Sequence, residues 1–154
     1  MLEAAGADLS AVLDLYAGTG ALGIEALSRG ASRCTFVESD ASAIAAIRDN
    51  LRKTGFEEQA AVIAARVGRW RPSQGVRYTL VMADPPYDDG GAWAAIAATV
   101  GRALASGAIL VVEHAARVPA PETCAGLPRW RDRRQGDGAL AIYRAGQAVG
   151  EDAE

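Results

Sequence analysis

The chain has 154 residues and a formal net charge of −3, with half of its residues hydrophobic and 23% charged. Such a composition fits one globular domain and excludes an intrinsically disordered chain. No apolar run reaches the roughly 20 residues of a membrane helix, and Met1–Gly6 lack the features of a signal peptide, so we expect a cytoplasmic protein without membrane partners. His114, Cys34 and Cys124 are too few and too scattered for a zinc site, so no metal is predicted.

Hydrophobic periodicity and turn residues predict strands that alternate with helices, followed by a hairpin. In chain order we expect a helix end at 1–8, a strand at Val12–Tyr16, a helix at Ala21–Ser28, a strand at Arg33–Glu38, a helix at Ala41–Lys53, strands at Ala60–Ala65 and Tyr78–Ala83, a helix at Ala92–Ala105, a strand at Ala108–Glu113, and hairpin strands at Trp130–Gln135 and Leu140–Arg144 around Gly136-Asp137-Gly138. Residues 145–154, which are small and acidic, are expected to form a disordered tail. The predicted domain therefore spans residues 1–144.

Alternating strands and helices favour a parallel sheet that is covered on both faces. Because crossovers are right-handed, the second and third strands lie to one side of the first strand, and the fourth and fifth lie to the other. Ligands of such sheets bind at the carboxyl ends of the strands, where the strand order reverses. This topology places the Gly18–Gly20 loop beside Asp84–Tyr87, although the two are far apart in the sequence.

The first predicted strand leads into Gly18-x-Gly20-x-x-Gly23, and Glu38 follows at the end of the second strand. Glycines let the backbone turn sharply, and a helix N-terminus offers free N–H groups, so this loop is expected to bind a nucleotide-like cofactor. The spacing fits the dinucleotide fingerprint, with Glu38 on the ribose hydroxyls, and NAD is one candidate. On its own this spacing is a weak signal.

Asp14 favours a different cofactor, because a pyrophosphate site has no need of a carboxylate directly before the glycine loop. S-adenosylmethionine carries a sulfonium and an ammonium group, and Asp14 is expected to hold the ammonium directly or through water. Glu38 would then accept two hydrogen bonds from the ribose. The alternative role for Asp14 is to cap the helix or the loop.

The tetrad Asp84-Pro85-Pro86-Tyr87 follows the fourth predicted strand. Prolines stiffen this segment and lack N–H groups, which leaves a rim of hydrogen-bond acceptors. If Asp84 and the Pro85 carbonyl each accept one N–H of a nucleobase amine, the nitrogen lone pair can point at a methyl donor. Tyr87 offers a ring on which an extruded base can stack. The tetrad is otherwise explained as a rigid loop after a strand.

Together these motifs resemble the RsmD-type 16S rRNA guanine-N2 methyltransferases. The similarity covers residues 1–144 and is carried by Asp14-Leu15-Tyr16-Ala17-Gly18-Thr19-Gly20-Ala21-Leu22-Gly23-Ile24-Glu25-Ala26-Leu27-Ser28-Arg29-Gly30, Val37-Glu38-Ser39-Asp40 and Asp84-Pro85-Pro86-Tyr87. The resemblance implies a Rossmann-like class I fold: a mostly parallel seven-stranded sheet of order 3-2-1-4-5-7-6, with helices on both faces and a C-terminal antiparallel hairpin. It also implies a bacterial, monomeric enzyme that uses S-adenosylmethionine on 16S rRNA or a small-subunit assembly intermediate.

Carried over residue by residue, the resemblance assigns two sets of site residues. The catalytic set is Asp84, Pro85, Pro86 and Tyr87; the cofactor contacts are Asp14, Tyr16, Ala17, Gly18, Thr19, Gly20, Glu38 and Ser39. Glu113 matches a family acid to which no role is assigned. The family has a further N-terminal segment before the position of Met1, and a small polar or acidic residue where this chain has Arg66.

Two arginine clusters are candidates for binding phosphate backbones, and are equally expected as solvated surface charges. They comprise Arg66, Arg69 and Arg71, and then Arg129, Arg131, Arg133 and Arg134. Two rival functions stay open at this point. One is an NAD-linked oxidoreductase, and the other is a non-catalytic RNA-binding module with a methyltransferase fold.

Overall fold

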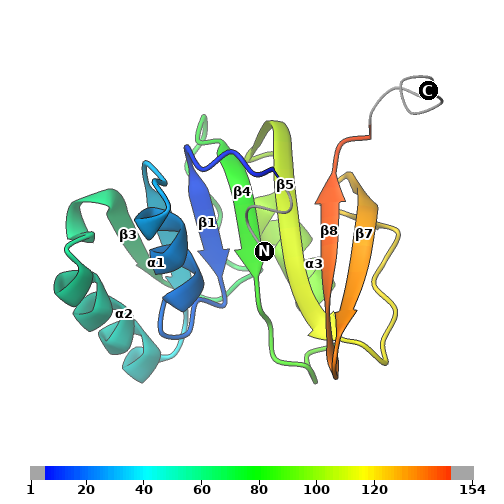
Figure 1. Ribbon diagram of the computed structural model, residues 1–154, viewed down its shortest axis with the longest axis horizontal. Coiled ribbons are helices and arrows are strands. Elements are labelled where there is room, and N and C mark those ends of the chain that lie inside the picture. The colour runs from blue at the N-terminus through cyan, green and yellow to red at the C-terminus, as the bar shows by residue number, and fades with distance from the viewer. Residues whose placement is uncertain (1–5, 147–154) are drawn as a thin grey trace.

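A computed structural model describes residues 6–146 of the chain (Figure 1). The elements are β1 (Val12–Leu15), α1 (Ala21–Ser28), β2 (Cys34–Glu38), α2 (Ala41–Thr54), the 3-10 helix η1 (Glu57–Gln59), β3 (Ala60–Ala64), β4 (Tyr78–Ala83), α3 (Ala92–Val100), β5 (Leu104–Ala115), β6 (Thr123–Cys124), β7 (Leu127–Gln135) and β8 (Gly138–Arg144). The strands form one eight-stranded sheet of order β3-β2-β1-β4-β5-β8-β7-β6.

Strands β1 to β5 run parallel, and the strand order reverses at β1, as predicted. Leu15 of β1 lies opposite Val37 of β2 on one side and Ala83 of β4 on the other. The chain therefore leaves β1, β2 and β4 at the same edge of the sheet. This register brings the glycine loop, Glu38 and Asp84 to one place.

Helices cover both faces of the sheet, with α1 and α2 on one face and α3 on the other (Figure 1). Because side chains alternate along a strand, neighbouring residues of β1 enter different cores. Val12 packs with residues of α1 and α2, whereas Leu13 packs with residues of α3, and both are fully buried.

The predicted Rossmann-like methyltransferase fold is confirmed, with one strand more than the predicted seven. The additional strand is β6, which pairs with the start of β7 in a tight turn around Ala125 and Gly126. Both turn residues have positive φ, at 51° and 79°. An alanine rarely adopts this conformation, so the sequence carried no recognisable turn signal there.

The boundary between the third long helix and the fifth strand was also predicted wrongly. Helix α3 ends at Val100 because Gly101 has a φ of 52°, and β5 begins at Leu104. The N–H of Tyr78 donates to the carbonyl of Ala103 at 2.8 Å, which draws this segment into the sheet.

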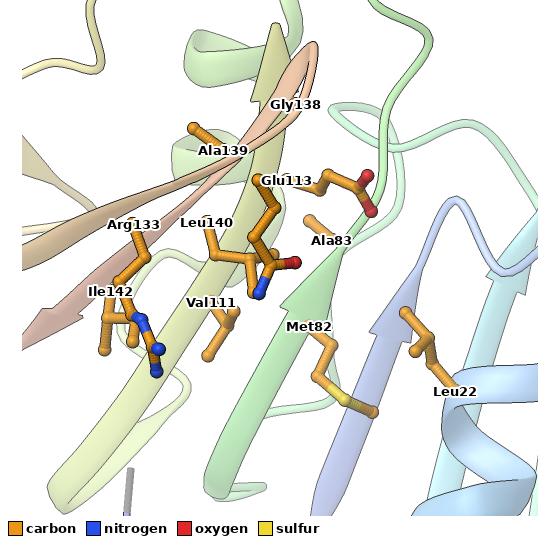
Figure 2. A pocket seen from close by; sticks show the side chains of 11 residues that line it. Leu22, Met82, Ala83, Val111, Glu113, Arg133, Gly138, Ala139, Leu140 and Ile142 are labelled. Atoms are coloured by element: carbon orange, nitrogen blue, oxygen red, sulfur yellow. The ribbon is translucent and has the colours of Figure 1, made fainter. Parts of the chain in front are cut away.

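Between α1 and the hairpin, one face of β4, β5 and β8 carries a hollow of about 550 Å³ (Figure 2). The predicted tail at 145–154 lies outside the described residues except for 145 and 146. The predicted helix end at 1–8 lies outside them except for 6–8, which are irregular. Over residues 6–146, no helix has the length and hydrophobicity needed to span a bilayer.

Candidate cofactor and acceptor site

The loop that leaves β1 is built from left-handed backbone conformations. Tyr16, Gly18 and Gly20 have φ values of 56°, 61° and 83°. Tyr16 is therefore a strained non-glycine residue, of the kind that clusters at functional sites. Gly18 has open space where a Cβ would stand, so a ligand can approach its backbone closely.

Asp14 lies beneath this loop and is buried, with 1% of its surface exposed. Its Oδ2 accepts a hydrogen bond from the N–H of Gly23 at 3.0 Å, so it serves the first turn of α1, where Gly20 has no side chain to do so. Burial, with a smaller effect from the nearby charges of Asp84 and Glu38, raises the pKa of Asp14 to about 7 against the opposing hydrogen bond from Gly23. Three carboxylates thus converge at the carboxyl edge of the sheet.

Glu38 turns back onto the loop from the end of β2. Its Oε1 accepts from the N–H of Gly18 at 2.8 Å, and its Oε2 accepts from the N–H groups of Ser39 and Asp40 at 2.9 Å. A carboxylate can accept about four hydrogen bonds, so these contacts orient Glu38 and leave it able to receive donors from a ligand.

The other loop residues expected to contact a cofactor are held by the backbone. Ala17 receives the N–H of Gly20 at 2.8 Å and donates its own N–H to Val37 at 3.1 Å. The carbonyl of Thr19 accepts from Nδ2 of Asn50, in α2, at 3.0 Å. Asn50 could not be predicted from the sequence, because nothing in the spacing of a half-buried helix residue indicates a contact 31 positions away.

Gly23 was predicted only as part of the glycine pattern, and the structure gives it a packing role. A Cβ at this position would clash with the ring of Phe36 and would lie 2.8 Å from Sγ of Cys34. The missing side chain lets α1 lie close against β2, which brings the Gly23 N–H within reach of Asp14. Both cysteines, at 34 and 124, are buried free thiols.

The tetrad lies across from this loop, as the topology predicted. Tyr16, Glu38, Asp84, Pro85, Pro86 and Tyr87 line a cavity of about 440 Å³. Asp84 is exposed at its rim, yet partial burial and the neighbouring Glu113 raise its pKa to about 6. Tyr87 is 43% exposed, so its ring is accessible to a base.

Glu113, near the end of β5, lies directly against the tetrad. The hydroxyl of Tyr87 donates to Oε1 of Glu113 at 3.3 Å. At the same hydroxyl, a Cβ at Gly138 of β8 would clash with Tyr87 and would lie 3.5 Å from Oε1 of Glu113. The hairpin therefore shapes the site, which no motif in the sequence indicates.

The arginine clusters lie in two different places. Arg66 and Arg69 are exposed in the turn after β3, where the Arg66 carbonyl accepts the N–H of Arg69 at 3.0 Å. The second cluster lies on β7, and Arg133 borders the 550 Å³ hollow together with Glu113 (Figure 2). Nearby, Arg131 lies 4.3 Å from the ring centre of Trp130. In the described part of the chain, no group of three histidine, cysteine or acidic residues is placed to hold a metal ion.

His114, the single histidine, is structural. It is buried on β5, and its Nε2 lies 2.8 Å from Oδ1 of Asp132 on β7. Its Nδ1 faces the carbonyls of Ala115 and Val118, both at 3.0 Å. This link connects β5 to β7 behind β8.

Comparison with known proteins extends over most of the chain. The profile of the family described as Conserved hypothetical protein 95 matches residues 1–144. YlbH of Bacillus subtilis (strain 168) is 34% identical over 136 residues, covering 86% of this chain and 74% of that protein. The ribosomal RNA small subunit methyltransferase D of Escherichia coli (strain K12) is 31% identical over 142 residues, covering 90% of this chain and 70% of that protein.

More distant matches share parts of the sequence or the fold. The tRNA1(Val) (adenine(37)-N6)-methyltransferase of Enterobacter sp. (strain 638) is 31% identical over 87 residues, covering 55% of this chain and 36% of that protein. The structure of an RNA methyltransferase from Salinibacter ruber in complex with S-adenosyl-L-homocysteine superposes with a TM-score of 0.69 at 17% identity, covering 99% of this chain and 92% of that one. With its fold, its motifs and a profile match over residues 1–144, this chain belongs to the Conserved hypothetical protein 95 family, the RsmD family that its motifs resemble.

Proposed function

We propose that this protein is an S-adenosylmethionine-dependent RNA methyltransferase that modifies the 2-amino group of a guanine in 16S rRNA. One observation carries the proposal: Tyr16 of the loop after β1, Glu38 of β2 and the Asp84–Tyr87 tetrad after β4 line a single cavity. The small-subunit rRNA methyltransferase among the relatives supports an rRNA substrate. The adenine-modifying relative matches only about half of the chain.

The residues at the glycine loop fit this cofactor. Asp14 is a buried carboxyl group whose pKa is raised to about 7, so a cation beside it would relieve an unfavourable charge. The cofactor's ammonium is such a cation, and Glu38 is oriented to receive the ribose hydroxyls. When bound, the cofactor supplies an electrophilic methyl group on a positively charged sulfur.

The tetrad prepares the amine. The lone pair of an exocyclic amine is delocalised into the base, and hydrogen bonds from its two N–H groups to the Asp84 carboxylate and the Pro85 carbonyl would hold it out of that conjugation. The nitrogen becomes acidic as it forms its new bond to carbon, so Asp84 can take the released proton. Tyr87 would stack on the base and fix its plane.

The arginines of β7 suit a nucleic-acid substrate. Arg131 and Arg133 are exposed on a strand that leads toward the hairpin turn, and that turn lies at the same edge as the tetrad (Figure 1). Phosphate groups along this strand would position the RNA, whereas the tetrad would act on the base. We further propose that the enzyme acts in the bacterial cytoplasm as a monomer.

Both rival functions make distinct predictions. An NAD-linked oxidoreductase would bind NADH, whereas we expect calorimetry to show binding of S-adenosylhomocysteine and none of NADH. A non-catalytic module would bind RNA tightly without transferring a methyl group. The family match and the antiparallel β5–β8 pairing favour a methyltransferase over the oxidoreductase.

The decisive experiment measures transfer of a labelled methyl group to 16S rRNA and to small-subunit particles from cells that lack this modification. We expect label in N2-methylguanosine after nuclease digestion, and mass spectrometry of fragments locates the acceptor. Asp84→Ala should abolish transfer, whereas Asp88→Ala, which removes an exposed acid of the same loop, should retain it. Full activity of Asp84→Ala would refute the mechanism, and label in N6-methyladenosine would refute the choice of base.

A further inference from the structure

The base that this site accepts can be inferred from a second acid next to the tetrad. Glu113 belongs to β5 and borders both the 550 Å³ hollow and a smaller cavity of about 300 Å³ that Pro85, Pro86 and Tyr87 also line. Figure 2 shows its side chain reaching from the end of β5 toward the chain that leaves β4 after Ala83. Asp84 is the next residue along that chain.

The two carboxyl groups lie close enough to influence one another. After partial burial, the causes that raise the pKa of Asp84 are the charge of Glu113 and the hydrogen bond that the Glu113 carboxylate accepts from protonated Asp84. Two adjacent carboxylates repel each other, and hydrogen-bond donors that face both of them relieve this repulsion. A ligand that offers two neighbouring N–H donors would therefore match the pair.

Guanine is the standard nucleobase that offers such a pair. Its ring N1–H stands next to its 2-amino group, whereas the ring nitrogen beside the amine of adenine or cytosine carries a lone pair. We propose that Glu113 selects guanine by accepting the N1–H while Asp84 accepts an N–H of the amine. This inference rests on the proposed function and names the residue that sets its base specificity.

Tyr87 fixes the plane of the base that Glu113 and Asp84 recognise. Its hydroxyl is held by Glu113 at 3.3 Å, and the glycine at 138 leaves room for the ring. A base stacked on this ring has its edge directed at Glu113 and Asp84. Because the carboxylate of Glu113 can accept several hydrogen bonds, the Tyr87 contact does not exhaust it.

The same arrangement rejects the other bases. In place of the N1–H, adenine and cytosine would direct a lone pair at the Glu113 carboxylate, which would then lose a donor and face repulsion. Sites that hydrogen-bond a specific substrate group reject analogues without it by roughly 10⁴- to 10⁵-fold, because the polar group of the protein is left unpaired. Since Glu113 is only partly buried, we expect about 100-fold discrimination.

The test uses an RNA in which the mapped acceptor guanine is replaced by 2-aminopurine. This analogue keeps the 2-amino group but has a lone pair at N1. We expect wild-type protein to methylate it with a kcat/KM about 100-fold lower than that for guanine. Glu113→Gln can donate an amide N–H to that lone pair, so its preference for guanine should fall below about tenfold. The loss of O6 in the analogue is common to both proteins and cancels in this comparison.

Glu122→Gln, which changes an exposed glutamate away from the site, should keep the wild-type preference. If Glu113→Gln turns over neither RNA, the affinities for the guanine and 2-aminopurine RNAs are measured with S-adenosylhomocysteine bound. The ratio of these affinities should then be smaller for the variant than for wild type. An unchanged preference in the Gln variant would overturn the role of Glu113 while leaving the proposed function intact. Failure of wild-type protein to methylate the guanine RNA would instead overturn the proposed function, and this inference with it.

Discussion

Replacing Asp14 with asparagine should stabilise the protein while it weakens cofactor binding. The folded-state pKa of Asp14 is raised from 3.8 to about 7, so the folded protein holds this proton more tightly than the unfolded chain does. Stability from the protonated carboxyl group is fully present below the unfolded pKa and is lost as the pH rises through about 7. At about 1.4 kcal/mol per unit, keeping Asp14 ionised at pH 8 costs about 4 kcal/mol of unfolding free energy.

Urea denaturation of wild-type protein and Asp14→Asn at pH 5 and pH 8 measures this effect. The cost at pH 5 is less than half that at pH 8, so the stability of the variant relative to wild type should rise by about 2–3 kcal/mol between them. The asparagine makes the same contact with the Gly23 N–H at both pH values, which removes that contact from the difference. Asp88→Asn, at an exposed position, is the matched control.

The same variant should bind S-adenosylhomocysteine about 10- to 100-fold more weakly, because a charged hydrogen bond to the ammonium becomes a neutral one. Calorimetry at pH 8 measures this loss. A variant with equal stability gains at both pH values would show that Asp14 is not ionised at a cost. Unchanged affinity would show that it does not hold the cofactor.

Four further predictions concern the acceptor side and the packing of the site. The kcat/KM for methyl transfer should fall below about pH 6, because the carboxyl group of Asp84, with its pKa raised to about 6, cannot accept an N–H once protonated. In Glu113→Gln, this fall of the pH–rate profile should move to lower pH. A fall near pH 4 in the wild-type protein would contradict the effect of Glu113 on the pKa of Asp84. Gly138→Ala should reduce methyl transfer about tenfold without changing cofactor affinity, because its Cβ displaces the tyrosine ring of the tetrad; equal kinetics would refute this. Arg133→Ala should weaken RNA binding and reduce its salt slope by roughly 0.7–0.9, measured by fluorescence anisotropy; an unchanged slope would exclude a phosphate contact. Gly23→Ala should destabilise the protein by about 1–3 kcal/mol in urea, since its Cβ overlaps a buried ring; a smaller effect would show that α1 can shift freely.

The core of the site could be predicted because it depends on local patterns and one topological rule. The strand, the glycine turn and the helix over residues 12–28 each have a signature of their own. Right-handed crossovers then place Asp84 next to that turn, although 66 or more positions separate the tetrad from Gly18.

What escaped prediction is made of single contacts between distant residues. Asn50 holds the loop through the Thr19 carbonyl, and Gly138 makes room for Tyr87. Neither residue stands in a motif, because one contact needs no periodic pattern. Strand β6 escaped for a different reason, since Ala125 adopts a backbone conformation that its residue type does not favour.

The bond between His114 and Asp132 has a consequence for how the protein would meet its substrate. Two sets of contacts fix β7 relative to β5: the backbone ladders through β8, and the side-chain bond between His114 and Asp132. The arginines of β7 and Glu113 of β5 therefore belong to one rigid part of the sheet. The span between a gripped phosphate and the reacting base is then a constant of the protein. The enzyme would therefore select its substrate by shape. An RNA whose fold does not match that distance would go unmodified, whatever its sequence.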